Sequence, residues 1–271
     1  MRRYSFHKGH GTKNDFIILD DSYGMHDMHP EFIAMLCDRH EGVGADGVIR
    51  VVRASSVREW DGDPNLWFMD YRNADGSVAE MCGNGLRVMA RHLINEQLVS
   101  SGSFDVATRA GVKHVAVARH GLISTVIGEA RVSREAVTVR LGDRSWEATK
   151  VDVGNPHAVV FVDHGQLAAL DLHEAPRWSP EEAFPEGANI EFVEVMGPGE
   201  LRMRVHERGV GETQSCGTGV VAVAAARRKD SGHEGRIRVT VPGGDLEVEF
   251  AGDEARLTGP AVIIGRGEFW I

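Results

Sequence analysis

Two cysteines of this 271-residue chain stand in the same local sequence, and both are suited to acid/base chemistry. A Cys-Gly-x-Gly motif begins at Cys82 and another at Cys216, and an apolar helical pattern follows each one. The two thiols are separated by about half of the chain, the spacing that an ancient duplication would leave. We therefore predict two similar lobes that carry one thiol each and face each other across a cleft.

Each thiol is expected at the first turn of a helix. Backbone N–H groups in that turn have no partner inside the helix, and the helix dipole favours negative charge there. This position is expected to lower the pKa of a thiol from its usual ~8.5. A single motif of this kind would equally fit a small buried cysteine, but its recurrence favours a site. Cys37 falls on the apolar face of an expected helix from Pro30 to His40, so we predict that it is a core residue.

The fold class predicted from the pattern is α/β (α+β), with many short strands separated by glycine-rich turns. The helix after Cys216 is apolar on nearly every side until Arg227, which indicates a buried helix. We expect two pseudo-symmetric lobes, each a strand-rich, barrel-like sheet around a central helix, with the active site in the cleft between them. The first lobe is expected over residues 1–119, completed by 262–271, and the second over 120–261.

Composition excludes several classes of function. A net charge of −10 argues against binding to nucleic acid or to anionic membranes. No apolar run approaches membrane-spanning length, and the three cysteines form no CxxC pair. We therefore expect a cytoplasmic protein with reduced thiols.

Metal and nucleotide sites are not expected either. His26 and His29, with Asp27 between them, have no further partner at ligand spacing, so we predict that the protein binds no metal. The glycine loop at 42–47 lacks the Lys-Ser/Thr of a phosphate-binding loop.

The ordered set of motifs resembles the diaminopimelate epimerase family over essentially the whole chain. The resemblance is carried by Asn14–Phe16, Asp38–Gly44, Asn73–Gly76, Cys82–Gly85, Gly154–His157, Glu207–Gly209 and Gly211–Gly219. It implies epimerisation of LL-2,6-diaminopimelate to its meso form, in lysine and peptidoglycan precursor synthesis. It also implies that no cofactor such as pyridoxal phosphate is needed, that these small molecules are the ligands, and that the protein is a homodimer.

The chemistry requires removal of an α-proton on one face of a carbon and return of a proton on the other. By the resemblance, Cys216 is the base toward the LL substrate and Cys82 is the acid, while His157 and Glu207 modulate the thiol pKa values. N–H groups at the two helix starts would stabilise charge that develops on the α-carboxylate. The resemblance implies substrate contacts from Asn14, Asn73, Gly83, Asn84, Asn155, Asn189, Glu207, Arg208, Gly217 and Thr218.

Two positions depart from the family pattern. Many members have Gly where this chain has Lys13, and Gln where it has Gly47. A substrate contact from position 47 is therefore not expected here. Taken singly, Asn73 and Asn155 also fit a role in turns, and Glu207 with Arg208 fits a surface ion pair of little energy.

Three other functions compete with this interpretation. The first is a proline or hydroxyproline racemase of the same architecture, which usually carries His at the position of Asn84. The second is a thiol redox sensor in which Cys82 and Cys216 form a disulfide. The third is a noncatalytic binding protein, against which the presence of both cysteines argues.

Overall fold

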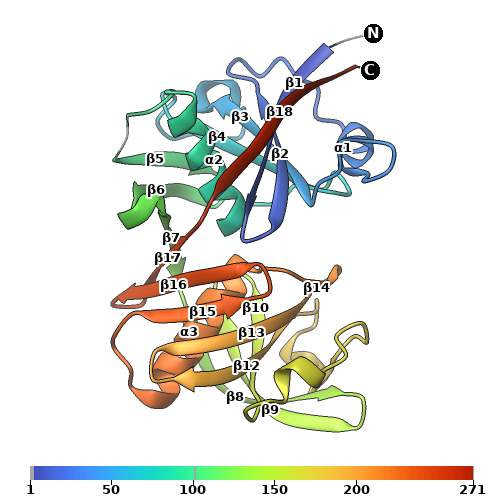
Figure 1. Ribbon diagram of the computed structural model, residues 1–271, viewed down its shortest axis with the longest axis vertical. Coiled ribbons are helices and arrows are strands. Elements are labelled where there is room, and N and C mark those ends of the chain that lie inside the picture. Colours follow the sequence, from blue (N-terminus) through green and yellow to red (C-terminus); the bar gives the residue numbers. More distant parts are fainter. Residues whose placement is uncertain (1–2, 101, 271) are drawn as a thin grey trace. The chain divides into compact units, whose positions relative to one another are not determined.

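The computed structural model describes residues 3–100 and 102–270, and the chain folds into two compact units. The first unit contains Met1–Thr125 and Gly259–Ile271, and the second contains Val126–Thr258. The chain leaves the first unit within β7 (Ile123–Glu129) and returns within β17 (Glu254–Gly259) (Figure 1). These crossings lie a few residues from the boundaries expected at 119/120 and 261/262.

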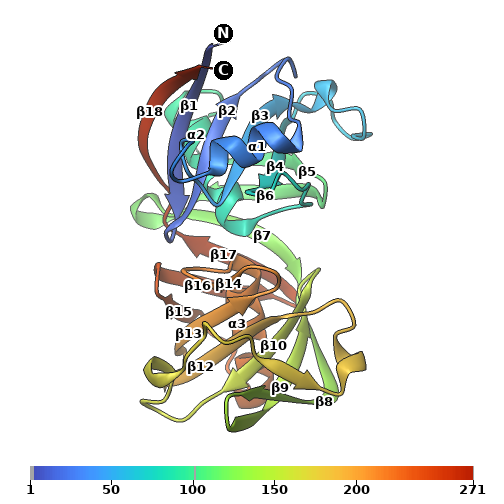
Figure 2. The ribbon, with the colours of Figure 1, turned by 90° about the vertical axis from the view of Figure 1, so that its right-hand side faces the viewer.

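The described residues of the first unit form a mixed sheet with two α-helices. Its strands run in the order β18-β1-β2-β3-β4-β5-β6-β7, and Figure 2 shows β18 beside β1 and β2. Among the described residues of this unit, the pairs β2–β3 and β4–β5 are parallel. The elements are β1 (Arg3–Gly11), β2 (Asn14–Asp20), α1 (Pro30–Cys37), β3 (Gly47–Arg53), β4 (Trp67–Asn73), α2 (Gly83–Asn95), β5 (Ser103–Thr108), β6 (Gly111–Val117), β7 and β18 (Val262–Trp270).

The second unit repeats this arrangement. Its strands run in the order β8-β9-β10-β12-β13-β15-β16-β17, and β10–β12 and β13–β15 are the parallel pairs. The short strands β11 and β14 add to β8 and to the end of β13. The elements are β8 (Arg131–Leu141), β9 (Arg144–Asp152), β10 (Pro156–Phe161), β11 (Arg177–Ser179), β12 (Asn189–Gly197), β13 (Glu200–Glu207), β14 (Gly211–Thr213), α3 (Gly217–Ser231), β15 (Ile237–Val241), β16 (Gly244–Ala251) and β17.

Because the strand orders match, each element of the first unit has a counterpart in the second. The hairpin β1–β2 corresponds to β9–β10, β3 to β12, and α2 to α3. In the parallel pairs Phe16 lies opposite Gly47, and His157 lies opposite Asn189. Phe16 thus corresponds to His157, and Gly47 to Asn189.

Each unit buries the apolar side of its helix against its own sheet. Helix α2 contacts β1–β4 and β18, and Leu86, Met89 and Leu93 are fully buried there. Helix α3 contacts six strands of the second unit, and its residues 219–226 are buried. The prediction of a buried helix after Cys216 is confirmed, as is the mixed, strand-rich fold class.

Helix α1 is shorter than the sequence indicated. It ends at Cys37, because the Asp38 carboxylate accepts the backbone N–H groups of His40 and Glu41 and turns the chain away. Cys37 is 5% exposed and packs in a core cluster with Ile33 and Leu36, as predicted. None of the helices within the described residues is long and apolar enough to cross a membrane.

We predict that Leu86→Ala lowers the free energy of unfolding by about 2–5 kcal/mol, because it leaves a cavity between α2 and the sheet. Urea unfolding of the wild type and the variant measures this loss. The control is Leu98→Ala, since the side chain of Leu98 is 37% exposed. Equal losses in the two variants would contradict this account of the core.

Candidate active site

Cys82 caps the N-terminus of α2. Its Sγ accepts the backbone N–H of Gly85 at 3.4 Å, and its carbonyl oxygen accepts that of Leu86. The Oδ1 of Asn14 lies 3.8 Å from Cys82 Sγ and accepts the Asn84 amide at 3.2 Å. The first unit thus brings Asn14, Cys82 and Asn84 together at the N-terminus of α2.

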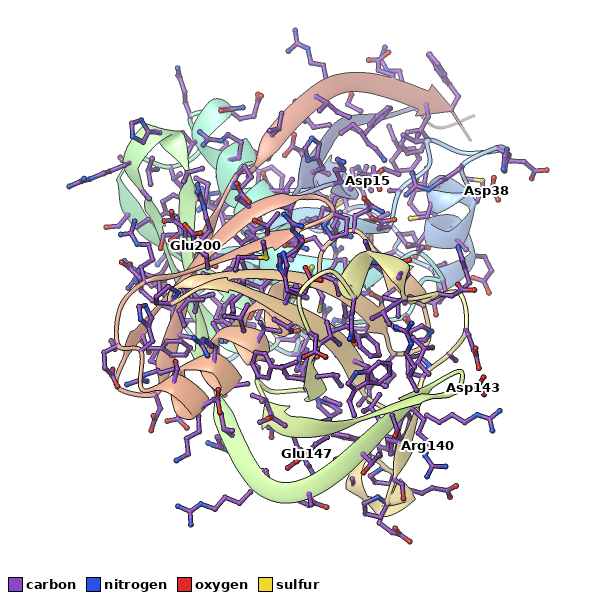
Figure 3. The ribbon with its side chains drawn as sticks, turned by 60° about the horizontal axis from the view of Figure 1, so that its bottom comes forward. Asp15, Asp38, Arg140, Asp143, Glu147 and Glu200 are labelled. Atoms are coloured by element: carbon purple, nitrogen blue, oxygen red, sulfur yellow. The ribbon has the colours of Figure 1, made fainter. Side chains whose placement is uncertain are left out.

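A cluster of charges positions Asn14. Its Nδ2 donates to Asp46 at 2.8 Å, and Arg39 joins Asp46 to Asp15. Asp15, labelled in Figure 3, also pairs with Lys8 at 2.6 Å. Burial raises the pKa of Asp15, but hydrogen bonds from Arg39 and Lys8 outweigh it and lower this pKa to about 2.

Arg87 is a fully buried cation in the second turn of α2. It donates to Asn84 Oδ1 at 2.8 Å, to the carbonyl oxygens of Gly83 and Pro260, and to Thr12 Oγ1. Burial lowers the pKa of Arg87 to about 10, and the charge of Cys82 opposes that shift. The guanidinium therefore stays charged at neutral pH, beside the first thiol.

The local backbone bears on both positions that depart from the family pattern, Lys13 and Gly47. Lys13 has φ +64° in the turn between β1 and β2, a conformation that costs a non-glycine residue about 1–2 kcal/mol. At Gly47, a Cβ would lie 2.6 Å from the Arg72 carbonyl oxygen and 2.7 Å from the Tyr71 ring. A side chain at position 47 therefore has no room in this backbone.

Asn73 ends β4 and serves a turn. Its amide donates to Ser77 Oγ at 3.0 Å, and its backbone accepts and donates within the same turn. A substrate contact from Asn73 stays a prediction.

Cys216 caps α3 in the same way as Cys82 caps α2. Its Sγ accepts the N–H of Gly219 at 3.4 Å and lies 3.5 Å from Thr218 Oγ1. The amide of Asn155 donates to Thr218 Oγ1 at 3.3 Å. The second unit therefore brings Asn155, Cys216, Gly217 and Thr218 together.

A buried polar pair continues this cluster into the core. His157 Nε2 lies 2.9 Å from Asn155 Oδ1, and His157 Nδ1 lies 2.7 Å from Glu191 Oε1. Both side chains of the pair are 0% exposed. His157 was predicted to act on the thiol, and the structure connects it to Cys216 through Asn155 and Thr218.

The pKa of Cys216 is raised, contrary to the expectation for a thiol at a helix start. Burial is the largest cause, followed by the negative charges of Glu207 and Glu191. Hydrogen bonds from Thr218 and Gly219 oppose the shift but do not outweigh it. The expectation failed because helix position is local, whereas burial of the sulfur depends on the whole unit.

The remaining predicted contacts of the second unit lie at the ends of β12 and β13. Asn189 Oδ1 accepts the backbone N–H of Arg208 at 3.0 Å, and its amide donates to the Pro156 carbonyl oxygen. Glu207 accepts a hydrogen bond from Thr213. The exposed side chain of Arg208 donates to the Glu186 carbonyl oxygen at 3.4 Å. In these hydrogen bonds the side chains of Glu207 and Arg208 each contact another residue and not each other.

Among residues 3–100 and 102–270, three side chains are grouped as metal ligands could be: His7, Asp20 and His92. His92 Nε2 lies 2.6 Å from Asp20 Oδ1, the distance of a direct hydrogen bond rather than of two ligands around an ion. Burial, with the nearby His92, lowers the pKa of His7. His26 and His29 do not belong to this group.

Comparison with known proteins decides the family. The sequence profile described as diaminopimelate epimerase matches residues 6–133 and 149–264. The chain belongs to the diaminopimelate epimerase family. The diaminopimelate epimerase of Streptomyces coelicolor is 49% identical over 98% of this chain and 96% of its own length. That of Corynebacterium glutamicum is 46% identical over 98% of both chains, and that of Thermobifida fusca 48% over 97% of both.

Solved structures share the fold at much lower identity. A phenazine biosynthesis protein of the PhzF family from Enterococcus faecalis has a TM-score of 0.74 at 12% identity over the full length of both chains. A hydroxyproline epimerase from Agrobacterium vitis has a TM-score of 0.70 at 13% identity, over 98% of this chain and 92% of its own. At these identities the likeness shows the fold alone.

Arg87 and Glu191 are site residues that the sequence reasoning missed. For Glu191 a signal existed, because residues two apart in a strand share a face and Asn189 was already a candidate. For Arg87 the signal was a charged residue between the apolar residues Leu86 and Val88, just after the motif at Cys82. Neither signal identified the partners, which come from distant parts of the chain.

We predict that the cluster around Asp15 makes stability depend on pH. Because the folded-state pKa of about 2 lies below the ordinary 3.8, its contribution of about 2 kcal/mol is present above pH ~4 and lost as the pH falls toward 2. Urea unfolding across this range should show a smaller acid loss in Asp15→Asn than in the wild type. Asp143→Asn is the control, because Asp143 lies exposed in the turn between β8 and β9 (Figure 3) and should keep the wild-type slope. An unchanged slope in Asp15→Asn would contradict the assignment.

Proposed function

We propose that this chain interconverts LL- and meso-2,6-diaminopimelate, an isomerase reaction of lysine biosynthesis, by proton transfer at one α-carbon. Membership of the family supports the reaction. The observation that supports the mechanism is the repeated half-site, in which a thiol caps a buried helix in each unit. Cys216 is the base toward the LL isomer and Cys82 the acid, and the roles exchange in the reverse direction.

The two units are proposed to be pseudo-symmetric, barrel-like lobes that place these thiols on opposite faces of the substrate. The matched strand orders and the matched helix caps support this arrangement. Helix starts in both units would then point N–H groups at one α-carboxylate and stabilise the charge that forms when the α-proton leaves. No cofactor enters this mechanism.

The polar groups of both half-sites are proposed to hold the two amino-acid ends of the substrate. Asn14 and Asn84 lie beside Cys82, and Asn155 and Thr218 beside Cys216. The exposed guanidinium of Arg208 would hold a carboxylate in bidentate fashion. An ammonium group bound near Glu207 would offset one of the charges that raise the pKa of Cys216, and so favour its thiolate. A homodimer and a cytoplasmic location stay predictions of the sequence.

We predict that Cys82→Ala and Cys216→Ala each reduce conversion of LL-diaminopimelate to the meso form by roughly 10²–10⁴-fold, because each removes one of the two acid/base groups. Proton NMR in D2O follows the meso product and the entry of deuterium. The matched control is Cys37→Ala, which removes the third thiol from a core position and should keep the activity. Full activity in either site variant would reject the two-thiol mechanism. If the reduced wild type does not convert LL-diaminopimelate, the proposal that this compound is the substrate is rejected.

A further inference from the structure

The pair formed by His157 and Glu191 lies directly beneath the first turn of α3. A Cβ added at Gly219 would lie 2.6 Å from Glu191 Oε1, so the carboxylate packs against the backbone that caps Cys216. Its second oxygen, Oε2, is buried without a hydrogen-bond partner within the part of the chain that the structure describes. A buried carboxylate that is only half satisfied is costly, and the proposed mechanism has not yet used it.

Hydrogen bonds run without a break from this carboxylate to the sulfur. They join Glu191 Oε1 to His157, His157 to Asn155, Asn155 to Thr218, and Thr218 to Cys216 Sγ. Each of these groups is a donor, an acceptor or both, so the chain has a direction.

The carboxylate end determines that direction. An ionised Glu191 accepts only, so His157 donates from Nδ1. When His157 is an imidazolium, Nε2 also carries a proton and donates it to the amide oxygen of Asn155, 2.9 Å away. The Asn155 amide then turns its N–H toward Thr218 Oγ1. That oxygen is occupied as an acceptor, and its own proton is left to point at Cys216 Sγ, 3.5 Å away.

We propose that Glu191 is a positioning residue that holds this chain in the direction in which the Thr218 hydroxyl donates to Cys216 Sγ. The inference rests on the proposed role of Cys216 as an acid/base group. With neutral His157 one ring nitrogen becomes an acceptor. The Asn155 amide can then reverse and draw the Thr218 proton to its own oxygen, so the sulfur loses a donor that stabilises its thiolate.

The first unit supports this assignment by contrast. Register makes Ile49 the counterpart of Glu191, and Phe16 the counterpart of His157. A Cβ at Gly85 would meet Ile49 Cδ1 at 3.2 Å, as one at Gly219 would meet Glu191. The same position beneath the helix is therefore apolar under Cys82 and charged under Cys216.

Titration of the Cys216 thiolate in a Cys82→Ala background tests the proposal. Cys37→Ala is added to this background, because burial raises the pKa of Cys37, to about 12, as well as that of Cys216, and the two thiols would otherwise titrate together. The titratable groups that face Cys216 are Glu191, Glu207 and, through Asn155, His157. Loss of the Thr218 hydrogen bond to the thiolate should raise the midpoint by roughly one pH unit in Thr218→Val. Glu191→Gln should lose the same hydrogen bond, but it also removes a negative charge that raises this pKa, so its effect is measured by comparison with Thr218→Val.

The matched control is Glu194→Gln. Glu194 is also a buried carboxylate of β12, but it accepts the backbone N–H of Leu167 and lies outside the chain to Cys216. It should leave the midpoint unchanged. If Glu191 acts on the sulfur only by its charge, Thr218→Val will raise the midpoint equally with and without Glu191→Gln, and that result would overturn the proposal.

A second variant tests the other end of the chain without touching the core. Thr218→Val should raise the Cys216 midpoint when Glu191 is present and leave it unchanged in the Glu191→Gln background, because both substitutions break the same chain. Nitrogen NMR of His157 should show two protonated ring nitrogens in the wild type and only one in Glu191→Gln. Additive shifts, or an unchanged midpoint in Thr218→Val, would overturn the proposal.

The D2O exchange assay separates failure of this inference from failure of the proposed function. If Cys216→Ala abolishes epimerisation but Thr218→Val shifts the thiol midpoint equally with and without Glu191→Gln, only the role of Glu191 is rejected. If Cys216→Ala epimerises normally, the role of Cys216 is rejected, and the inference about its positioning is rejected with it.

Discussion

In each unit a cysteine thiol caps a buried helix, and the candidate site is built around that cap. Sγ replaces the oxygen of the usual capping residues and accepts the N–H of the glycine three positions on, Gly85 or Gly219. A Cβ at either glycine would meet the strand beneath, at Ile49 or Glu191. A helix that is capped by a thiol and packs this closely on the strand beneath therefore requires glycine three positions after the cysteine. This explains why the motif Cys-Gly-x-Gly occurs twice.

The same scaffold surrounds its two thiols with different charges. Beside Cys82 lies the buried cation Arg87, bound to the loop and helix that carry Asn14 and Asn84. Beneath Cys216 lie Glu191 and His157, and burial with nearby carboxylates raises the pKa of that thiol. The proposed mechanism needs the two thiols in opposite protonation states, and such a difference would favour it, because identical sites would favour the same state in both.

Much of this was predictable from the sequence, in physical terms. The glycine motifs and the apolar residues after Cys216 predicted two helix starts and a buried helix, since these are local patterns. The raised pKa of Cys216 was not predictable, because burial is a property of the folded unit. The partners of Arg87 include Thr12 and Pro260, which lie at opposite ends of the chain and meet only through the pairing of β1 with β18. Local spacing contains no information on such contacts.

The central claim is that each thiol exchanges a proton on one face of the α-carbon, and the most direct test is stereospecific exchange in D2O without inversion. Cys82→Ala should wash the α-proton out of the LL isomer, through Cys216, and form no meso product. Cys216→Ala should not exchange the α-protons of the LL isomer for deuterium. It should exchange only the α-proton of the D-configured centre of the meso isomer. Exchange of both configurations by either single variant would contradict the account, because one thiol would then reach both faces.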